Sequence, residues 1–227
     1  MSVWKSSGRL GAVVTGVAMH ACGGMPAQGP PPSPADPGHA ELEALFLARA
    51  DSATMRFSPA DVAFMTGMIR HHGQAIEMAT LSPSRGASPS ILTLSGRVIN
   101  AQRDEIALMR SWLADRGQPV PPPDGSIAGG GLPGGVQSMH APGMLTPEQM
   151  AGLRGTTGPS FDRRFLRSMI QHHQGAVTMV DELFATDGAA LDETVFRLAS
   201  AIRVDQITEI SRMERMLEEL PAPPRRP

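Results

Sequence analysis

Two segments of the chain place methionines around a pair of adjacent histidines. The first segment, FMTGMIRHHGQAIEMA, begins at Phe64, and the second, FLRSMIQHHQGAVTMV, begins at Phe165. Imidazole nitrogen binds several transition metals, whereas the soft thioether sulfur of methionine suits Cu(I) and adds little for Mg²⁺, Ca²⁺ or Zn²⁺. The doubled pattern therefore indicates a binding site for a soft metal ion, and copper, with Cu(I) favoured, is the expected cofactor.

The candidate metal ligands all lie within about two helical turns of a histidine pair. They are His71, His72, Met65, Met68, Met78, His172, His173, Met169 and Met179. Leu166 stands at the position that corresponds to Met65, so the second half is poorer in sulfur. The sequence leaves open whether both halves bind metal, and adjacent helical residues diverge by about 100°, so one pair need not hold one ion.

A second interpretation assigns the same residues to a structural network. Helical periodicity puts polar side chains on the predicted inward stripes, where burial is costly unless they are hydrogen-bonded. These supporting residues are Asp61, Asp162, Gln102 and Gln206. In a metal protein they would support the imidazole rings, and Asp61 and Asp162 would orient a ring N–H or supply an oxygen ligand. Without metal, they would make the chain a structural or interaction module.

A ferritin-like di-iron redox protein is a third hypothesis. It would require four carboxylates, including Glu-x-x-His on two facing helices. Only Glu105 and Glu209 stand at plausible inward positions, and no Glu lies three residues before a paired histidine. Other catalytic patterns are also absent from the sequence, including His-Glu-x-x-His and a glycine-rich phosphate loop. We therefore expect coordination chemistry rather than an enzyme.

The segments that position these residues have helical patterns. Ser58-Pro59 and Ser88-Pro89 are typical helix starts, with a capping serine and proline at the first helical position. Gly117 closes the second of these helices. The predicted helices cover residues 39–52, 59–79, 89–116, a short segment from 147, 159–185, and a final helix that ends at 220.

The two halves of the chain repeat one another. His71 and His72 recur as His172 and His173, and Gln102 recurs as Gln206. Each half is thus a helical hairpin, and one hairpin with an apolar stripe on each helix cannot bury itself alone. The prediction is an all-α fold, a four-helix bundle built from two homologous hairpins.

Composition limits the partners. The chain has 227 residues, 41% of them hydrophobic, which is enough for one domain with a real core. The net charge is −2, so there is no basic surplus to neutralise phosphates, and nucleic acid is not an expected partner. Formation of a homo-oligomer stays open.

The N-terminus is typical of an exported protein. Two basic residues precede the apolar stretch LGAVVTGVAM, which is too short to span a bilayer as a helix, and the only cysteine, Cys22, follows. We expect residues 1–22 to be a lipoprotein-type export signal, with Cys22 as the lipidation site and a membrane anchor in the bacterial cell envelope. An ordinary secreted protein with an incidental cysteine is the alternative.

The remaining predicted boundaries follow from composition. Residues 23–38 form a Pro/Gly-rich tether, and residues 39–220 form the helical domain. Within this domain, repeat 1 covers about 40–118, a flexible linker covers 118–145, and repeat 2 covers about 146–220. Residues 221–227 are a tail.

The segments DVAFMTGMIRHHGQAIEMA and GPSFDRRFLRSMIQHHQGAVTMV resemble a bacterial family known as domain of unknown function 305. The resemblance extends to the later AQRDEIALMRSWL and DQITEISRMERML, and it covers about residues 40–118 and 145–220. The family includes the CopM-type copper-binding proteins of the periplasm. Membership implies a ferritin-like helical bundle, and for some members it implies copper binding through the histidines and methionines named above.

Overall fold

The computed structural model describes residue 38 and residues 40–45, 57–122 and 141–221. The chain divides into two units between Ala44 and Leu45. Residues 40–45 are helical, which is the described part of the helix predicted for residues 39–52. The predicted export signal and Cys22 lie outside the described residues, as do the predicted tether up to residue 37 and the tail from residue 222. Within the described residues, no helix combines the length and apolar character needed to cross a bilayer.

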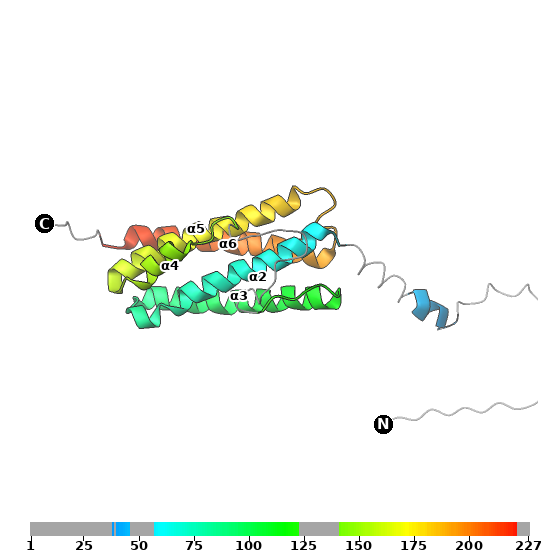
Figure 1. The fold of residues 1–227 in the computed structure, drawn as a ribbon, viewed down its shortest axis with the longest axis horizontal. Coiled ribbons are helices and arrows are strands. Elements are labelled where there is room, and N and C mark those ends of the chain that lie inside the picture. Colours follow the sequence, from blue (N-terminus) through cyan, green and yellow to red (C-terminus); the bar gives the residue numbers. More distant parts are fainter. Residues whose placement is uncertain (1–37, 39, 46–56, 123–140, 222–227) are drawn as a thin grey trace, which may run out of the picture. The chain divides into compact units, whose positions relative to one another are not determined.

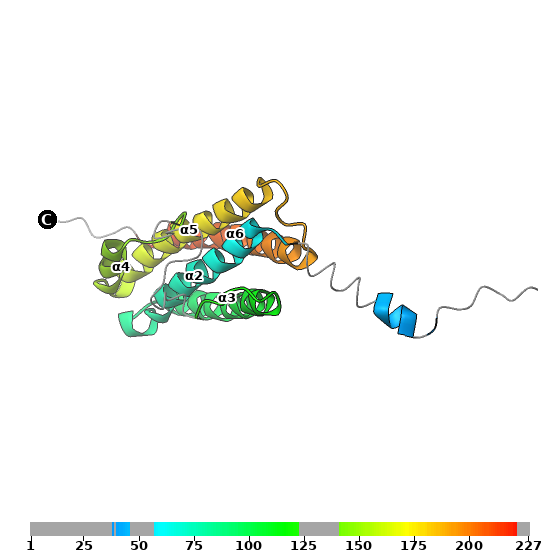
Figure 2. The same cartoon turned by 45° about the vertical axis from the view of Figure 1, so that its right-hand side comes forward.

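The larger unit consists of two helical hairpins, and the predicted all-α fold is confirmed. The first hairpin contains α2 (Pro59–Thr80) and α3 (Pro89–Asp115), joined through the short 3₁₀ helix η1 (Pro83–Arg85). The second contains α5 (Gly158–Phe184) and α6 (Glu193–Glu219), preceded by the short α4 (Pro147–Arg154). In both ribbon views α2 lies between α3 and the second hairpin (Figures 1 and 2), and α2 against α5 is the main contact between hairpins.

The start of α2 and the end of α3 follow their sequence signals, whereas the side chain of Ser88 makes no capping hydrogen bond at the start of α3. The hydroxyl of Ser58 accepts from the main-chain N–H of Asp61 at 3.1 Å, and the carboxylate of Asp61 accepts from the N–H of Ser58 at 2.7 Å. This reciprocal capping box satisfies two N–H groups that the first helical turn would leave unpaired. After the end of α3, Gly117 adopts φ 64°, a left-handed conformation that suits glycine just after a helix.

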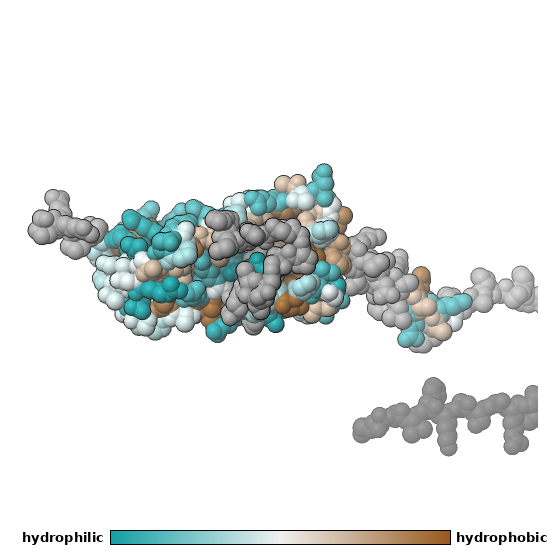
Figure 3. Space-filling model, viewed as in Figure 1, coloured by the Kyte–Doolittle hydropathy of each residue, from teal (hydrophilic) through white to brown (hydrophobic). Residues whose placement is uncertain are grey.

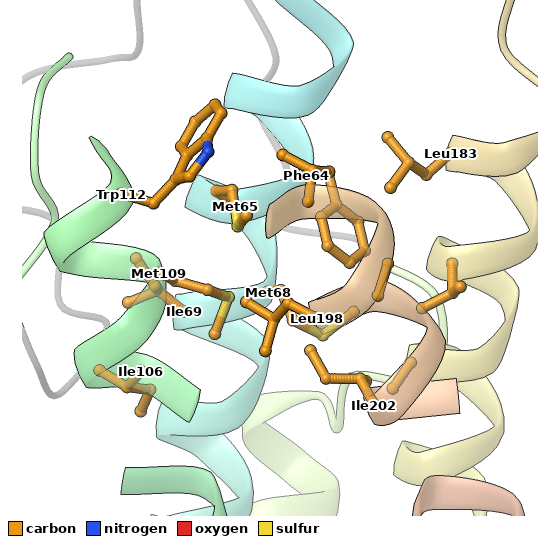
Figure 4. Close-up of a cluster of buried hydrophobic side chains, with 14 of the residues drawn as sticks. Phe64, Met65, Met68, Ile69, Ile106, Met109, Trp112, Leu183, Leu198 and Ile202 are labelled. Atoms are coloured by element: carbon orange, nitrogen blue, oxygen red, sulfur yellow. The ribbon is translucent and has the colours of Figure 1, made fainter. Parts of the chain in front are cut away.

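Two apolar clusters fill the bundle, one toward each end. The first combines the start of α2 and the end of α3 with the end of α5 and the start of α6. Figure 4 shows its methionines Met65, Met68 and Met109 among aromatic and aliphatic side chains such as Phe64 and Trp112. The second combines the end of α2 and the start of α3 with Phe165, Leu166 and Met169 of α5 and Met213 of α6. Facing helices of the two hairpins are therefore antiparallel.

The two clusters are related by the internal repeat. Ile91, Leu94 and Val98 of α3 lie in the second cluster, and their counterparts Val195, Leu198 and Ile202 of α6 lie in the first. An approximate two-fold axis therefore passes between α2 and α5, midway between the clusters. The visible surface mixes hydrophilic and hydrophobic residues (Figure 3), as expected for helices with one buried face.

Candidate metal centre

A polar layer separates the two apolar clusters at the middle of the bundle. It contains the four histidines of the two motifs, each at most 1% exposed, and the amides of Gln102 and Gln206, each 2% exposed. The carboxylates of Glu105 and Glu209 reach this layer from α3 and α6. Buried polar groups are rarely tolerated without partners, so the partners of each ring define what the layer can do.

His71 and His172 meet each other across the interface between α2 and α5. Their ring centroids are 3.8 Å apart, and the ring planes are inclined by 39°. Because the two residues correspond in the repeat, each hairpin brings the same histidine to the two-fold axis. The sequence predicted that both were candidate ligands, and the fold brings these two rings into direct contact.

Burial keeps both of these rings neutral. Loss of solvent, reinforced by the neighbouring His72, lowers the pKa of His71 from 6.5 to about 3, although the carbonyl of Pro142 opposes the shift. Burial also lowers the pKa of His172 well below 6.5, and the neighbouring His71, His173 and His72 add to the effect. Only a neutral imidazole has the nitrogen lone pair that a metal ion requires.

His72 and His173 bind partners within their own hairpins. Nε2 of His72 lies 2.8 Å from a carboxylate oxygen of Glu105, and Nε2 of His173 lies 2.7 Å from that of Glu209. Since an ionised carboxylate only accepts hydrogen bonds, each ring donates from Nε2. Sequence reasoning had placed both glutamates at inward positions without assigning them to these rings.

Several buried polar atoms in the layer have no hydrogen-bond partner in the structure. They are Nδ1 of all four histidines, Nε2 of His172, both amide atoms of Gln102 and the amide oxygen of Gln206. In a neutral ring that donates from Nε2, Nδ1 carries the free lone pair. A ring with one nitrogen bonded to an oxygen acceptor and the other free matches the arrangement common among metal-ligating histidines.

The predicted methionine ligands lie on both sides of this layer. Met68 and Met169 precede the histidine pairs by one turn and are fully buried, in the first and second clusters respectively. Met65 and Met78 are also fully buried, whereas Met179 is partly buried against the first cluster. A side chain at Gly67 of α2 would meet the terminal methyl of Met179 at 3.2 Å, so Met179 reaches across to the opposite hairpin.

The prediction that Asp61 and Asp162 orient a histidine ring is wrong. The carboxylate of Asp61 accepts from the N–H of Ala190, in the loop before α6, at 2.7 Å, in addition to its bond with Ser58. The carboxylate of Asp162 accepts from the N–H of Ser88, the residue before α3, at 3.2 Å. Each aspartate therefore joins its own hairpin to the helix start of the other.

The end of the predicted flexible linker is held firmly against this layer. Residues 141–145, which we call the strap, cross α2 and α5 before α4 begins. The side chain of Gln74 accepts from the N–H of Leu145 at 2.8 Å and donates to its carbonyl at 3.0 Å. Nε2 of His71 lies 3.0 Å from the carbonyl oxygen of Pro142.

Within the described residues, no three His, Cys, Asp or Glu side chains converge as they would around a metal ion. A metal ion in this layer would therefore need thioether or amide ligands beside imidazole. This donor chemistry, a pair of neutral imidazoles flanked by buried sulfur, fits a soft ion.

The geometry defines a class of helical protein, namely a two-hairpin bundle with a buried histidine layer on its internal two-fold axis. Residues 61–217 match the family described as domain of unknown function (DUF305), and the chain belongs to this family. No protein of curated function matches the chain.

Solved structures give the same result. A DUF305 fragment from Deinococcus radiodurans is 31% identical, with 72% of this chain and 99% of that chain covered and a TM-score of 0.60. A DUF305 protein from Streptomyces coelicolor, thought to be secreted, is 26% identical, with 70% and 93% covered and a TM-score of 0.58. CopM in its Cu(I)-bound form is 28% identical, with 70% and 95% covered and a TM-score of 0.53.

Proposed function

We propose that this chain is an exported copper-binding protein that stores, buffers or delivers copper in the bacterial cell envelope. The observation that carries the proposal is the set of buried histidine Nδ1 atoms without hydrogen-bond partners. Leaving such an atom unpaired costs about 1–3 kcal/mol, and a metal ion that takes up the lone pairs would offset that cost. His71 and His172 are the primary candidates because their rings are in contact.

Methionine sulfur supports copper over harder ions. Met68 and Met169 lie one turn from the histidines, where side chains on one helix face approach each other closely. Met65, Met78 and Met179 are further candidate ligands on the same helices. CopM has been crystallised with Cu(I), Cu(II) and silver, and Ag⁺ resembles Cu(I) in its preference for soft ligands. Because Leu166 stands at the position that corresponds to Met65, the two halves offer unequal sets of candidate sulfur ligands.

The ligands are preassembled on helices, so metal binding and folding are linked. Ligands that come together only in the native state make the metal a stabiliser of that state. At a free metal concentration 100 times the dissociation constant, the gain in unfolding free energy is about 2.7 kcal/mol. No covalent reaction is required for this function.

The test is a titration of purified protein with Cu(I) in competition with a chromogenic chelator, repeated with redox-stable Ag⁺. We expect one high-affinity site, which is lost when both His71 and His172 are replaced by alanine. Met68→Leu and Met169→Leu should weaken binding, whereas the matched control Met150→Leu, a buried methionine of α4 outside the motifs, should not. High affinity retained after replacement of all four histidines would refute the assignment.

A structural role without metal is the second candidate, favoured by the His72–Glu105 and His173–Glu209 bonds. On this hypothesis His72→Gln and His173→Gln lower the melting temperature of the metal-free protein, and added Cu(I) or Ag⁺ changes the melting temperature of no variant. Metal-dependent stabilisation of the wild type would reject it.

Export and lipidation of Cys22 belong to the same proposal. They rest on the N-terminal sequence, which lies outside the described residues, and export accords with the Streptomyces relative that is thought to be secreted. Labelling of cells with a fatty acid should mark the wild type and not Cys22→Ser. An unlabelled wild-type protein in the culture medium would favour simple secretion instead.

A further inference from the structure

The two homologous histidines at the two-fold axis have different surroundings. Nε2 of His71 is bonded to the carbonyl of Pro142, whereas neither ring nitrogen of His172 has a hydrogen-bond partner. The strap is the cause of this difference, because the carbonyl of Pro142 meets the ring of His71 and no strap atom forms a hydrogen bond with the ring of His172. The approximate two-fold symmetry that brings the two rings together therefore does not extend to their hydrogen bonds.

The strap is positioned by two residue types, Gly and Gln, whose order differs between the two motifs. The histidine pairs are followed by Gly73-Gln74 in the first motif and by Gln174-Gly175 in the second. Gln74 makes two hydrogen bonds with the main chain of Leu145. Its counterpart Gly175 leaves room for the strap, because a Cβ there would lie 1.9 Å from the carbonyl oxygen of Pro142.

Further contacts hold the strap at the same place. A Cβ at Gly143 would lie 2.5 Å from the carbonyl oxygen of Gln171 and 2.8 Å from Cα of Gly175, so strap and α5 touch main chain to main chain. Gly143 also has φ 74°, a conformation that favours glycine. Leu145 is 5% exposed and belongs to the second apolar cluster. Pro142 is thus fixed from both sides.

We propose that the strap is a positioning element of the copper site and fixes the tautomer of His71. A carbonyl oxygen only accepts, so the neutral ring of His71 carries its proton on Nε2 and presents its lone pair at Nδ1. The bond also fixes the rotation of the ring, and such supporting bonds raise the basicity of a ligating histidine. His71 is then a preorganised ligand, whereas no hydrogen bond determines which ring nitrogen of His172 would bind the metal.

This inference rests on the proposed function and adds Pro142, Gln74 and Gly175 as positioning residues. Loss of a bond that supports a ligating histidine typically weakens metal affinity by 10- to 100-fold. Displacement of the strap should reduce Cu(I) affinity by about that factor while leaving His71, His172 and the methionines unchanged.

The experiment uses Gly175→Ala, whose new methyl group collides with the Pro142 carbonyl, and Gly96→Ala as a matched control. Gly96 lies in α3, and a Cβ there meets nothing within 4 Å. Gln74→Ala, which removes both bonds to Leu145, is the second variant in case Gly175→Ala does not fold. Far-ultraviolet circular dichroism establishes folding, and chelator competition gives the Cu(I) affinity.

Long-range ¹⁵N–¹H spectra of ¹⁵N-histidine-labelled, metal-free protein provide a readout that is independent of copper. We expect the Nε2–H tautomer for His71 in the wild type and in Gly96→Ala. In Gly175→Ala and Gln74→Ala we expect a mixture of tautomers, together with the loss of affinity. An Nδ1–H tautomer in the wild type, or unchanged affinity and tautomer in both strap variants, would overturn the inference. Absence of Cu(I) binding by the wild type would instead overturn the proposed function.

Discussion

The buried pair His71 and His172 should make the stability of the metal-free protein depend steeply on pH. The pKa of His71 falls from 6.5 in the unfolded chain to about 3 in the fold, and that of His172 also falls well below 6.5. Between these values the unfolded state binds protons that the native state excludes. Stability is therefore greatest above pH 6.5 and is lost progressively as the pH falls toward the folded pKa.

The size of the effect follows from linkage. Each such histidine lowers the unfolding free energy by about 1.4 kcal/mol for each pH unit below 6.5, so both together cost about 2.7 kcal/mol between pH 7.5 and 5.5. Typical domains have only about 5–15 kcal/mol in total. Ordinary carboxylates stay ionised in this window, so their protonation contributes little.

The assay is urea unfolding at pH 7.5, 6.5 and 5.5, in the presence of a metal chelator, for the wild type and for His172→Gln. The variant keeps a neutral polar side chain but cannot take up the proton. We expect it to lose about 1.4 kcal/mol less than the wild type over the window. All other histidines are common to both proteins, so the difference isolates His172. Equal losses in the two proteins would refute the assignment of a buried, neutral ring.

Three further predictions concern the scaffold and the sulfur ligands. Asp162→Ala removes the acceptor for the N–H of Ser88 and should cost about 1–3 kcal/mol in urea unfolding, whereas Asp181→Ala, which breaks an exposed pair with Arg203, should cost less than about 1 kcal/mol. Asp192 caps α6 and accepts from Trp112 and Arg116, so Asp192→Ala should cost about 3–5 kcal/mol, and a loss below 1 kcal/mol would contradict this role. Met68→Leu conserves volume and should cost less than about 1.5 kcal/mol yet weaken Cu(I) binding, so a variant with unchanged affinity would remove Met68 from the ligand set.

The helices and their pairing could be predicted because they depend on local signals. Ser58-Pro59 and Ser88-Pro89 start α2 and α3, and the apolar periodicity identified the buried faces. The internal repeat then required two similar hairpins, and two hairpins with one apolar face each have few ways to cover each other. These signals do not specify how each hairpin is rotated about its helix axes.

The role predicted for Asp61 and Asp162 was wrong because residues on one helical face can still lie far apart along the helix axis. Asp61 shares a helical face with His72, but the two residues are 11 positions apart, which corresponds to about 16 Å along a helix. A carboxylate in the first turn cannot reach that ring, and it binds the nearest unpaired N–H groups instead. The rise per residue, available from the sequence, would have separated Asp61 and Asp162 from the histidine layer.

The strap was predicted to be part of a flexible linker because its proline and glycine content is typical of loops. Its contacts depend on Gly175 and Gln74, which come from two different hairpins. The exchange of Gly-Gln for Gln-Gly after the histidines was the only signal in the sequence. The repeat pairs the two positions, but only the fold shows that Gln74 binds Leu145 of the strap whereas Gly175 lies against Pro142.

The position of the axis also explains why adjacent histidines differ in role. A residue on a two-fold axis meets its own counterpart, as His71 does with His172. A residue off the axis must find a different partner, as His72 and His173 do with Glu105 and Glu209 of their own hairpins. The bonds to glutamate can form in one hairpin alone, whereas the axial pair exists only when both hairpins pack. A metal ion bound by the axial pair would therefore stabilise the packing of the two hairpins against each other rather than either hairpin alone.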